Sequence, residues 1–179
     1  MIRHDYHAHS QFSDGSEMAA MVRAAAAAGL AGIGIADHCI VFEDEFGRRD
    51  QFDLVETYER RRERITEIRE EFDVAVFDAA EVSYHPDHEV ATRSFLREAE
   101  FDYVVGSVHF TDEFDVTATA PYVDLSEGER RAAVDDYFDR QVALVESGLF
   151  DVVAHLDLPE RVGPLRGLAS IAVYLLIGA

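Results

Sequence analysis

The sequence has no lysine and no tryptophan, and only one cysteine. All 16 of its basic residues are therefore arginine, and 36 acidic residues outnumber them, which gives a formal net charge of −20. Nucleic-acid binding depends on clustered lysine and arginine side chains that neutralise phosphates. This balance argues against DNA or RNA as a bulk partner, and we expect no nucleic acid to bind.

The single cysteine, Cys39, excludes an internal disulfide and favours a reducing compartment. The first residues are too polar for a secretory signal peptide. The longest apolar run, residues 171–179, is far too short to span a membrane. Together these features predict a cytoplasmic protein that makes no contact with a membrane.

The acidic residues are spread along segments with apolar patterning, so an acidic disordered tail does not explain them. We interpret the lysine-free, acidic composition as an adaptation to high salt. Strong screening removes the self-repulsion that a net charge of −20 causes in dilute buffer. The protein is therefore expected to be halophilic.

Strand-like and helix-like segments alternate along the 179 residues, a length that suits one domain. The predicted strands cover 2–6, 31–37, 74–81, 103–109 and 150–155, and the predicted helices cover 16–29, 52–72, 88–99 and 126–148. Ser126 and Glu129 have the spacing of a capping box at the start of the last helix. The alternation predicts an α/β fold of parallel strands joined by crossovers.

Each predicted strand ends in a residue type that binds metal ions. These residues are, in chain order, His7 with His9, then His38, Glu81, His109 and His155. In a parallel α/β barrel such strand ends converge on one face, where active sites are built. His7 and His9 are two residues apart, so both imidazoles can reach one ion. The pattern predicts a metal centre for Zn, Mn or Fe.

Other residues of the same types have plainer interpretations. His4 lies at the opposite end of the first strand and is predicted to be structural. His85 and His88 follow Glu81 and are expected in an exposed loop. Cys39 is better explained as a small buried residue than as a soft ligand.

Five segments, HAHSQFSDG, GIADH, AAE, GSVH and AHLDLP, follow one another over residues 5–159. They resemble the motifs of the PHP family, named after polymerase and histidinol phosphatase. FDYVVGSVHF and FDVVAHLDLPER are most similar to the histidinol-phosphatase branch. The resemblance implies a distorted β/α barrel of seven strands with two or three divalent metal ions. Only five strands are convincing, so the barrel is expected to be incomplete at the C-terminus.

The resemblance also implies which residues hold the ions and take part in catalysis. It assigns His7, His9 and Glu81 to a first ion, Glu81, His109 and His155 to a second, and Asp14 with His38 to a third. Its implied catalytic residues are Glu81, His109 and His155.

Two residues near the last predicted strand have two interpretations each. Arg161 resembles an arginine that holds the substrate phosphate, and it is equally well explained as a solvated charge. Asp157 either orients His155 or caps the segment that follows it.

The resemblance implies a metal-dependent phosphomonoester hydrolase with a small phosphorylated substrate, and histidinol phosphate in histidine biosynthesis is the first expectation. A phosphoesterase for another small phosphate, such as a nucleotide, is an alternative. A catalytically inactive metal-binding fragment or scaffold is another, because the family's C-terminal Asp-x-His has no counterpart after Asp157. The oligomeric state stays open.

The end of the sequence differs in composition from the rest. From Gly167 onward no residue is charged, in a protein that is 29% charged. We therefore expect residues 1–166 to form a partial PHP domain and residues 167–179 to form an apolar tail that is truncated or altered.

Overall fold

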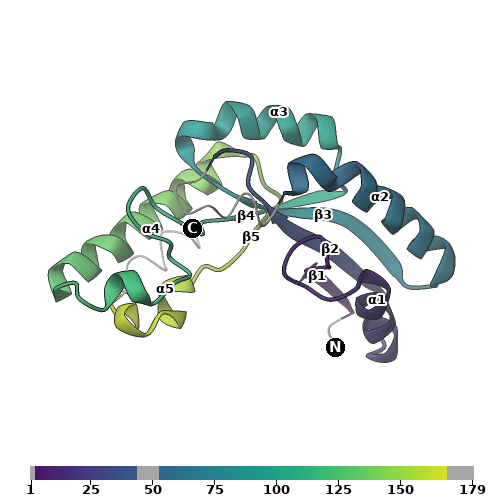
Figure 1. Ribbon diagram of the computed structural model, residues 1–179, viewed down its shortest axis with the longest axis horizontal. Helices are drawn as coiled ribbons and strands as arrows, with labels where there is room; N and C mark the ends of the chain where they lie inside the picture. Colours follow the sequence, from purple (N-terminus) through teal and green to yellow (C-terminus); the bar gives the residue numbers. More distant parts are fainter. Residues whose placement is uncertain (1–2, 44–52, 169–179) are drawn as a thin grey trace. The chain divides into compact units, whose positions relative to one another are not determined.

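The computed structural model describes residues 3–43 and 53–168, in which strands and helices alternate (Figure 1). The strands are β1 (His4–Ala8), β2 (Gly32–Cys39), β3 (Ala75–Ser83), β4 (Tyr103–Ser107) and β5 (Val152–Val153). The α-helices are α1 (Met18–Ala27), α2 (Leu54–Glu71), α3 (Glu89–Ala99), α4 (Glu127–Ser147) and α5 (Leu158–Arg161). Short 3-10 helices cover Pro86–His88, Ala120–Tyr122 and Gly163–Leu165.

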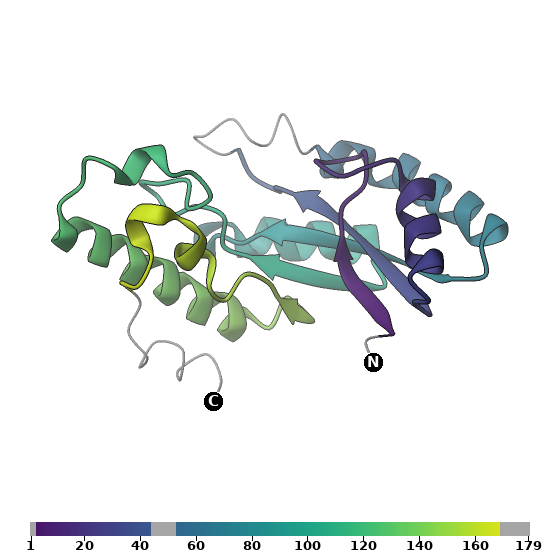
Figure 2. The same cartoon turned by 90° about the horizontal axis from the view of Figure 1, so that it is seen from below.

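The five strands form one sheet in chain order, β1-β2-β3-β4-β5. β1 pairs with β2, and β2 with β3, in parallel. Figure 2 shows the arrowheads of these three strands pointing the same way. The predicted α/β fold with five strands is confirmed. β5 is much shorter than the predicted strand 150–155, because only two of its residues pair.

The chain divides into two compact units. The N-terminal unit comprises Met1–Val82 and Val90–Val105, and the C-terminal unit comprises Ser83–Glu89 and Gly106–Ala179. Each unit has an apolar core of its own.

The core of the N-terminal unit lies between two helices and one face of the sheet. Val22 of α1 and Ile65 of α2 are fully buried in the same cluster as Ile35 of β2 and Val76 of β3. Side chains of a strand alternate between its two faces, so the residues between these point to the opposite face. Helix α1 ends where Gly29 adopts a positive φ of 74°, as the sequence predicts.

Aromatic rings cover that opposite face where β2 has glycines in place of side chains. A Cβ on Gly34 would lie 1.7 Å from the Tyr103 hydroxyl, and a Cβ on Gly32 would lie 2.7 Å from the His4 ring. His4 also stacks on Tyr6, with the ring centroids 5.4 Å apart. His4 therefore has the structural role that its position in the sequence predicts.

The core of the C-terminal unit is built around α4. Tyr137 and Leu144 of this helix are buried together with Tyr84, Tyr122 and Leu165. The predicted capping box is present at its start, and its C-cap glycine is left-handed with a φ of 60°. The sequence therefore defines both ends of α4 correctly.

Two further expectations concern membranes and the end of the chain. None of the described helices combines the length and apolar character that a membrane-spanning helix needs. Most of the predicted apolar tail, from residue 169 onward, lies outside the described residues.

Candidate metal centre

An irregularity in β1 directs His7 and His9 toward the sheet face that carries the candidate centre. Asp5 pairs with Ile33 and Ala8 with Ile35, so three steps of β1 match two steps of β2. The extra residue turns Ala8 into the helix-covered core, where it is 5% exposed. His7 and His9 consequently point the other way. Such irregularities often re-aim side chains next to active sites.

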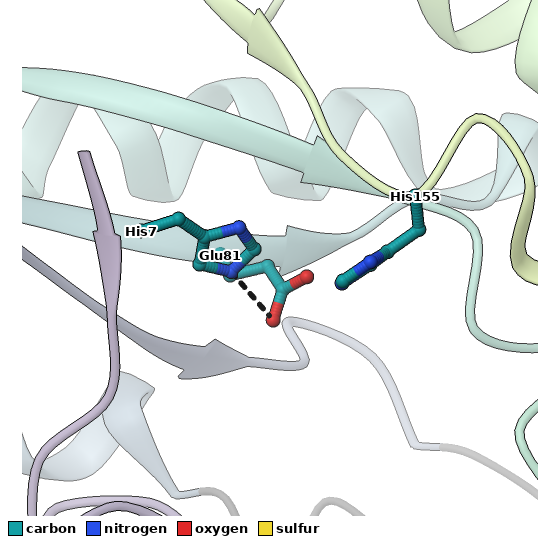
Figure 3. A group of neighbouring side chains, drawn as sticks. All are labelled: His7, Glu81 and His155. Atoms are coloured by element: carbon teal, nitrogen blue, oxygen red, sulfur yellow. Dashed lines mark ion pairs between the residues drawn. The ribbon is translucent and has the colours of Figure 1, made fainter. Parts of the chain in front are cut away.

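The centre of the group is the carboxylate of Glu81, near the end of β3. Its Oε2 atom lies 3.3 Å from His7 Nε2 and 3.2 Å from His9 Nε2. Figure 3 shows the His7–Glu81 pair as a dashed line; His155, also drawn there, belongs to the C-terminal unit. The Glu81 side chain is fully buried, and the two imidazoles are only partly exposed.

His38 reaches the same carboxylate oxygen from β2. His38 and Glu81 are register partners in the parallel pairing of β2 with β3, so both side chains point to one face. Their closest atoms, His38 Nδ1 and Glu81 Oε2, are 2.8 Å apart. One ligand atom from each of His9, His38 and Glu81 lies within 4.8 Å of the others.

Asp14 contacts two of these histidines from the loop that follows β1. Its Oδ1 atom is 2.6 Å from His9 Nδ1, and its Oδ2 atom is 3.5 Å from His38 Nε2. When His9 Nδ1 donates its proton to Asp14, Nε2 is left with the lone pair that a metal ion needs. The structure thus brings five of the predicted ligands together: His7, His9, Asp14, His38 and Glu81.

Gly15 allows the end of the loop after β1 to lie directly against the backbone of His9 and Ser10. A Cβ at this position would lie 1.8 Å from the carbonyl oxygen of His9. The Gly15 N–H also donates to the Ser10 carbonyl at 3.0 Å. Glycine is therefore required beside Asp14 for a steric reason, because every other residue type would push the loop away from His9.

The surroundings of His9 favour its charged form when no ion is bound. Burial by itself lowers the pKa of His9, but the hydrogen bonds to Glu81 and Asp14, with the charges of both carboxylates, raise that pKa to about 9. The pKa of Asp14 is held below its usual range: burial alone raises it, but the hydrogen bond to His9 and the nearby imidazoles lower it more. The two carboxylates therefore stabilise a positive charge on the His9 imidazole.

The spacing of the donor atoms fits a divalent ion. His7 Nε2 and His9 Nε2 are 3.1 Å apart, and each is 3.2–3.3 Å from Glu81 Oε2. A tetrahedral zinc ion with bonds of ~2.0–2.1 Å has its ligand atoms about 3.3–3.4 Å from one another. Two imidazole nitrogens and one carboxylate oxygen therefore already have the separations of one triangular face of such a site.

The two remaining predicted ligands, His109 and His155, lie in the C-terminal unit. Their ring centroids are 5.8 Å apart. His109 is 3% exposed, and its Nδ1 atom is 2.8 Å from the hydroxyl of Ser83. His155 has a left-handed backbone with a φ of 54°, and the Tyr137 hydroxyl donates to its carbonyl oxygen.

The structure shows the surroundings of two other predicted site residues. Arg161 is exposed on the last turn of α5. Asp157 stands at the N-cap of the same helix, but its carboxylate makes no cap hydrogen bond.

One sequence expectation is wrong and several contacts were missed. The His85 side chain is only 12% exposed, and it pairs with Asp112 at 2.8 Å. The partner of His109, Ser83, carried no recognisable signal in the sequence, since a serine at a strand end is ordinary. Gly15 did carry one, because it directly follows the acidic residue of the first motif. Cys39 is fully buried, as predicted.

Comparison with known proteins agrees with the motif order. The PHP domain matches residues 5–174 of this sequence. The chain belongs to the PHP family.

Among known PHP-type relatives, the protein named "Probable histidinol-phosphatase" from Deinococcus radiodurans is 32% identical to this chain over 85 residues. That alignment covers 48% of this chain and 33% of the relative. This chain therefore matches about a third of the length of that relative.

Two solved structures have the same fold. Histidinol phosphate phosphatase from Lactococcus lactis, complexed with zinc, L-histidinol and phosphate, has a TM-score of 0.74 at 22% identity. The match covers 98% of this chain and 66% of that one. The structure of hisK from Listeria monocytogenes has a TM-score of 0.72 at 19% identity, and the match covers 97% of this chain and 75% of that one.

Proposed function

We propose that this chain carries the metal-binding centre of a phosphomonoesterase that hydrolyses histidinol phosphate to histidinol and phosphate. The observation that carries this proposal is the convergence of three imidazoles on one oxygen of Glu81 in a member of the PHP family. A relative of the same fold is complexed with zinc, L-histidinol and phosphate, which supports the choice of ligand and substrate.

The side chains of the centre have separate tasks in this proposal. Divalent ions at such a centre polarise the phosphoryl group and make water a better nucleophile near neutral pH. His7, His9 and Glu81 hold a first ion, and Asp14 keeps His9 in the tautomer that binds it. His38 and Asp14, whose Nε2 and Oδ2 atoms are 3.5 Å apart, would hold another. In the C-terminal unit, Ser83 orients His109 for the same task.

The imidazole-rich donor set suits zinc, manganese or iron. We further propose that His109 and His155 complete the ligand set together with Glu81, and that Arg161 binds the substrate phosphate. The division into a domain over residues 1–166 and a tail over residues 167–179 also stays a proposal.

A cavity in the C-terminal unit favours histidinol phosphate over a nucleotide. It measures about 500 Å³ and has Phe114 and Leu125 in its wall. The first of its lining residues in the sequence is Thr111, two residues after His109. The same wall carries four carboxylates, on Asp112, Glu113, Glu129 and Asp136. A protonated amine such as that of histidinol suits an acidic wall, whereas a nucleoside monophosphate carries no such cation to pair with these carboxylates.

The test is to load the purified chain with Zn²⁺ or Mn²⁺ and to measure phosphate release from histidinol phosphate, a nucleoside monophosphate and p-nitrophenyl phosphate. We expect histidinol phosphate to be hydrolysed fastest, and Glu81→Gln to abolish the reaction. Faster hydrolysis of the nucleotide would assign the centre to another small phosphate. Stoichiometric metal without turnover would favour the inactive metal-binding scaffold.

A further inference from the structure

An arginine is completely buried in the N-terminal unit, on the helix-covered face of the sheet. Arg61 of α2 is 0% exposed. Its Nε donates to Asp37 Oδ2 at 2.7 Å, and its Nη1 donates to Asp78. Its Nη2 donates to two carbonyl oxygens, that of Ile35 and that of Ala79, the latter at 2.7 Å. The guanidinium therefore ties β2 to β3 through four acceptors.

Stability alone does not account for this network. Removing charged groups from water is costly, and well-packed apolar side chains of similar volume are often as stable as a buried ion pair or more so. The three other arginines of the same stretch, Arg60, Arg62 and Arg64, all keep some exposure to solvent. A buried ion-pair network at one position of α2 therefore needs a second reason to be there.

That reason is suggested by where the two carboxylates lie in the strands. Asp37 directly precedes His38 in β2, and Asp78 precedes Glu81 by three residues in β3. Side chains at odd separations in a strand point to opposite faces. Arg61 and the two aspartates thus lie on the helix-covered face of the sheet, and His38 and Glu81 project from the opposite face at the same level.

Asp37 also fixes the loop that carries the other donors. Its Oδ1 accepts from the Ser10 N–H at 2.6 Å and from the Ser13 hydroxyl at 2.8 Å, and its Oδ2 accepts from the Ser10 hydroxyl at 2.8 Å. Ser10 directly follows His9, and Ser13 directly precedes Asp14. One carboxylate therefore links the loop with His9 and Asp14 to the strand with His38.

We propose that Arg61 and Asp37 are positioning residues that set the relative places of His9, Asp14, His38 and Glu81. This inference rests on the proposed metal-dependent function. The planar guanidinium of Arg61 donates to Asp37 in a fixed direction and thereby fixes the orientation of its carboxylate. That carboxylate in turn accepts hydrogen bonds from Ser10 and Ser13 and holds them in place. Arg61 and Asp37 lie on the helix-covered face and are not among the candidate ligands, so they act through the segments that carry those ligands.

The decisive variant is Ser13→Ala, because it removes one hydrogen bond to Asp37 at a partly exposed position and leaves the buried charges in place. We expect affinity for Zn²⁺, measured by competition with a chromogenic chelator, to fall about 10-fold or more, within the 10–100-fold range found when partners of metal ligands are removed. Ser13→Thr keeps the hydroxyl and is expected to restore the affinity. Ser94→Ala, an exposed serine on α3, is the control and should leave it unchanged.

Melting of the metal-free proteins separates positioning from general stability. Ser13→Ala should melt close to the wild-type temperature while its Zn²⁺ affinity is reduced. Equal Zn²⁺ affinities for Ser13→Ala, Ser13→Thr and the wild type would overturn the proposal. Parallel losses of Zn²⁺ affinity and melting temperature in Ser13→Ala, not restored by Ser13→Thr, would also overturn it.

A second pair of variants tests Arg61 directly. Arg61→Lys keeps the charge but loses the fork, whereas Arg64→Lys makes the same change at a partly exposed arginine that pairs with Glu17 and Glu67. We expect weaker Zn²⁺ binding in Arg61→Lys alone. Because chelator competition needs no turnover, a wild-type chain that binds Zn²⁺ without hydrolysing phosphate esters would refute the proposed function and leave this inference standing. A wild-type chain that binds no divalent ion would overturn both.

Discussion

His38 Nδ1 lies 2.8 Å from Glu81 Oε2, and the two residues are register partners on β2 and β3. This pairing places one imidazole beside the carboxylate through the sheet itself, while His7 and His9 reach the same oxygen from an irregular β1. The part of the centre in the N-terminal unit is therefore built from three adjacent strands. Its geometry depends on their register and on the loop after β1, which carries His9 and Asp14.

Replacing Glu81 with glutamine should remove the centre's ability to hold metal. The amide has the same shape but no charge, and its N–H groups face imidazole nitrogens where an oxygen now lies. We expect Zn²⁺ affinity to fall by more than about 100-fold, since loss of a ligand exceeds loss of a ligand's partner. Metal content per chain after dialysis, measured by mass spectrometry, checks this.

The matched control is Glu98→Gln, which makes the same change at an exposed position on α3. It should leave the bound metal unchanged. Full metal occupancy in Glu81→Gln would contradict the assignment of Glu81 as a ligand.

The metal-free protein should lose stability as the pH rises from about 6.5 to 9. The pKa of His9 is about 9 in the folded protein, against 6.5 for an ordinary histidine. In this window the folded chain holds a proton that the unfolded chain has released, so raising the pH favours unfolding. Thermal melts in the presence of a chelator, taken from pH 6 to 9.5, measure the effect.

Asp14→Asn supplies the comparison, because it removes one of the two carboxylates that raise the pKa of His9. The fall in melting temperature should then end at a lower pH. A wild-type melting temperature that is constant or rises between pH 7 and 9 would show that His9 does not hold this proton.

Gly15→Ala should disrupt the loop after β1 without disturbing the core. The added Cβ would lie 1.8 Å from the His9 carbonyl oxygen, so the loop must move and take Asp14 with it. We expect at least a ~10-fold loss of Zn²⁺ affinity, comparable to the removal of a ligand's partner. Gly128→Ala is the control, because its Cβ would meet nothing closer than the Ser126 hydroxyl at 4.0 Å. Equal affinities for the two variants would contradict this account.

The sequence predicts which side chains of this centre lie together, because they occur at equivalent places at the ends of successive strands. Strand ends in an alternating α/β pattern converge whatever the details of packing, so His38 and Glu81 were expected to be neighbours and are. The register of β1 was not predictable, because the strand was expected at 2–6 but extends to Ala8 through an extra residue. The short sequence of β1 carries no local signal for the position of the extra residue between Asp5 and Ala8.

The buried polar contacts were beyond sequence analysis for a different reason. Arg61 stands among four neighbouring arginines of α2, and only the packing of the helix on the sheet decides which one is buried. His85 was expected to be exposed, but it pairs with Asp112, 27 residues away. Partners this distant in the chain are found only once the fold is known.

Ser83→Ala should affect the second group of candidate ligands. The Ser83 hydroxyl and His109 Nδ1 are 2.8 Å apart, and both side chains are almost completely buried. Loss of this hydrogen bond should cost about 0.5–1.5 kcal/mol of unfolding free energy. It should also free the His109 ring to turn, which weakens metal binding. Ser83→Thr should preserve both properties, and an unchanged urea midpoint in Ser83→Ala would contradict the role of Ser83.

The excess of acidic residues should make the stability of the whole chain depend on salt. The 36 acidic residues outnumber the 16 arginines, so an excess of 20 negative charges remains even where arginines are paired, as Arg69 is with Asp102 and Arg131 with Glu127. Added KCl shortens the Debye length to ~3 Å near 1 M and screens the repulsion between the remaining carboxylates. We therefore expect the melting temperature to rise steadily from 0.05 to ~2 M KCl, a range chosen to span strong and weak screening. Since sulfate also strengthens apolar burial, chloride is the salt to use. A melting temperature that stays flat or falls over this series would rule out the adaptation to high salt that the composition predicts.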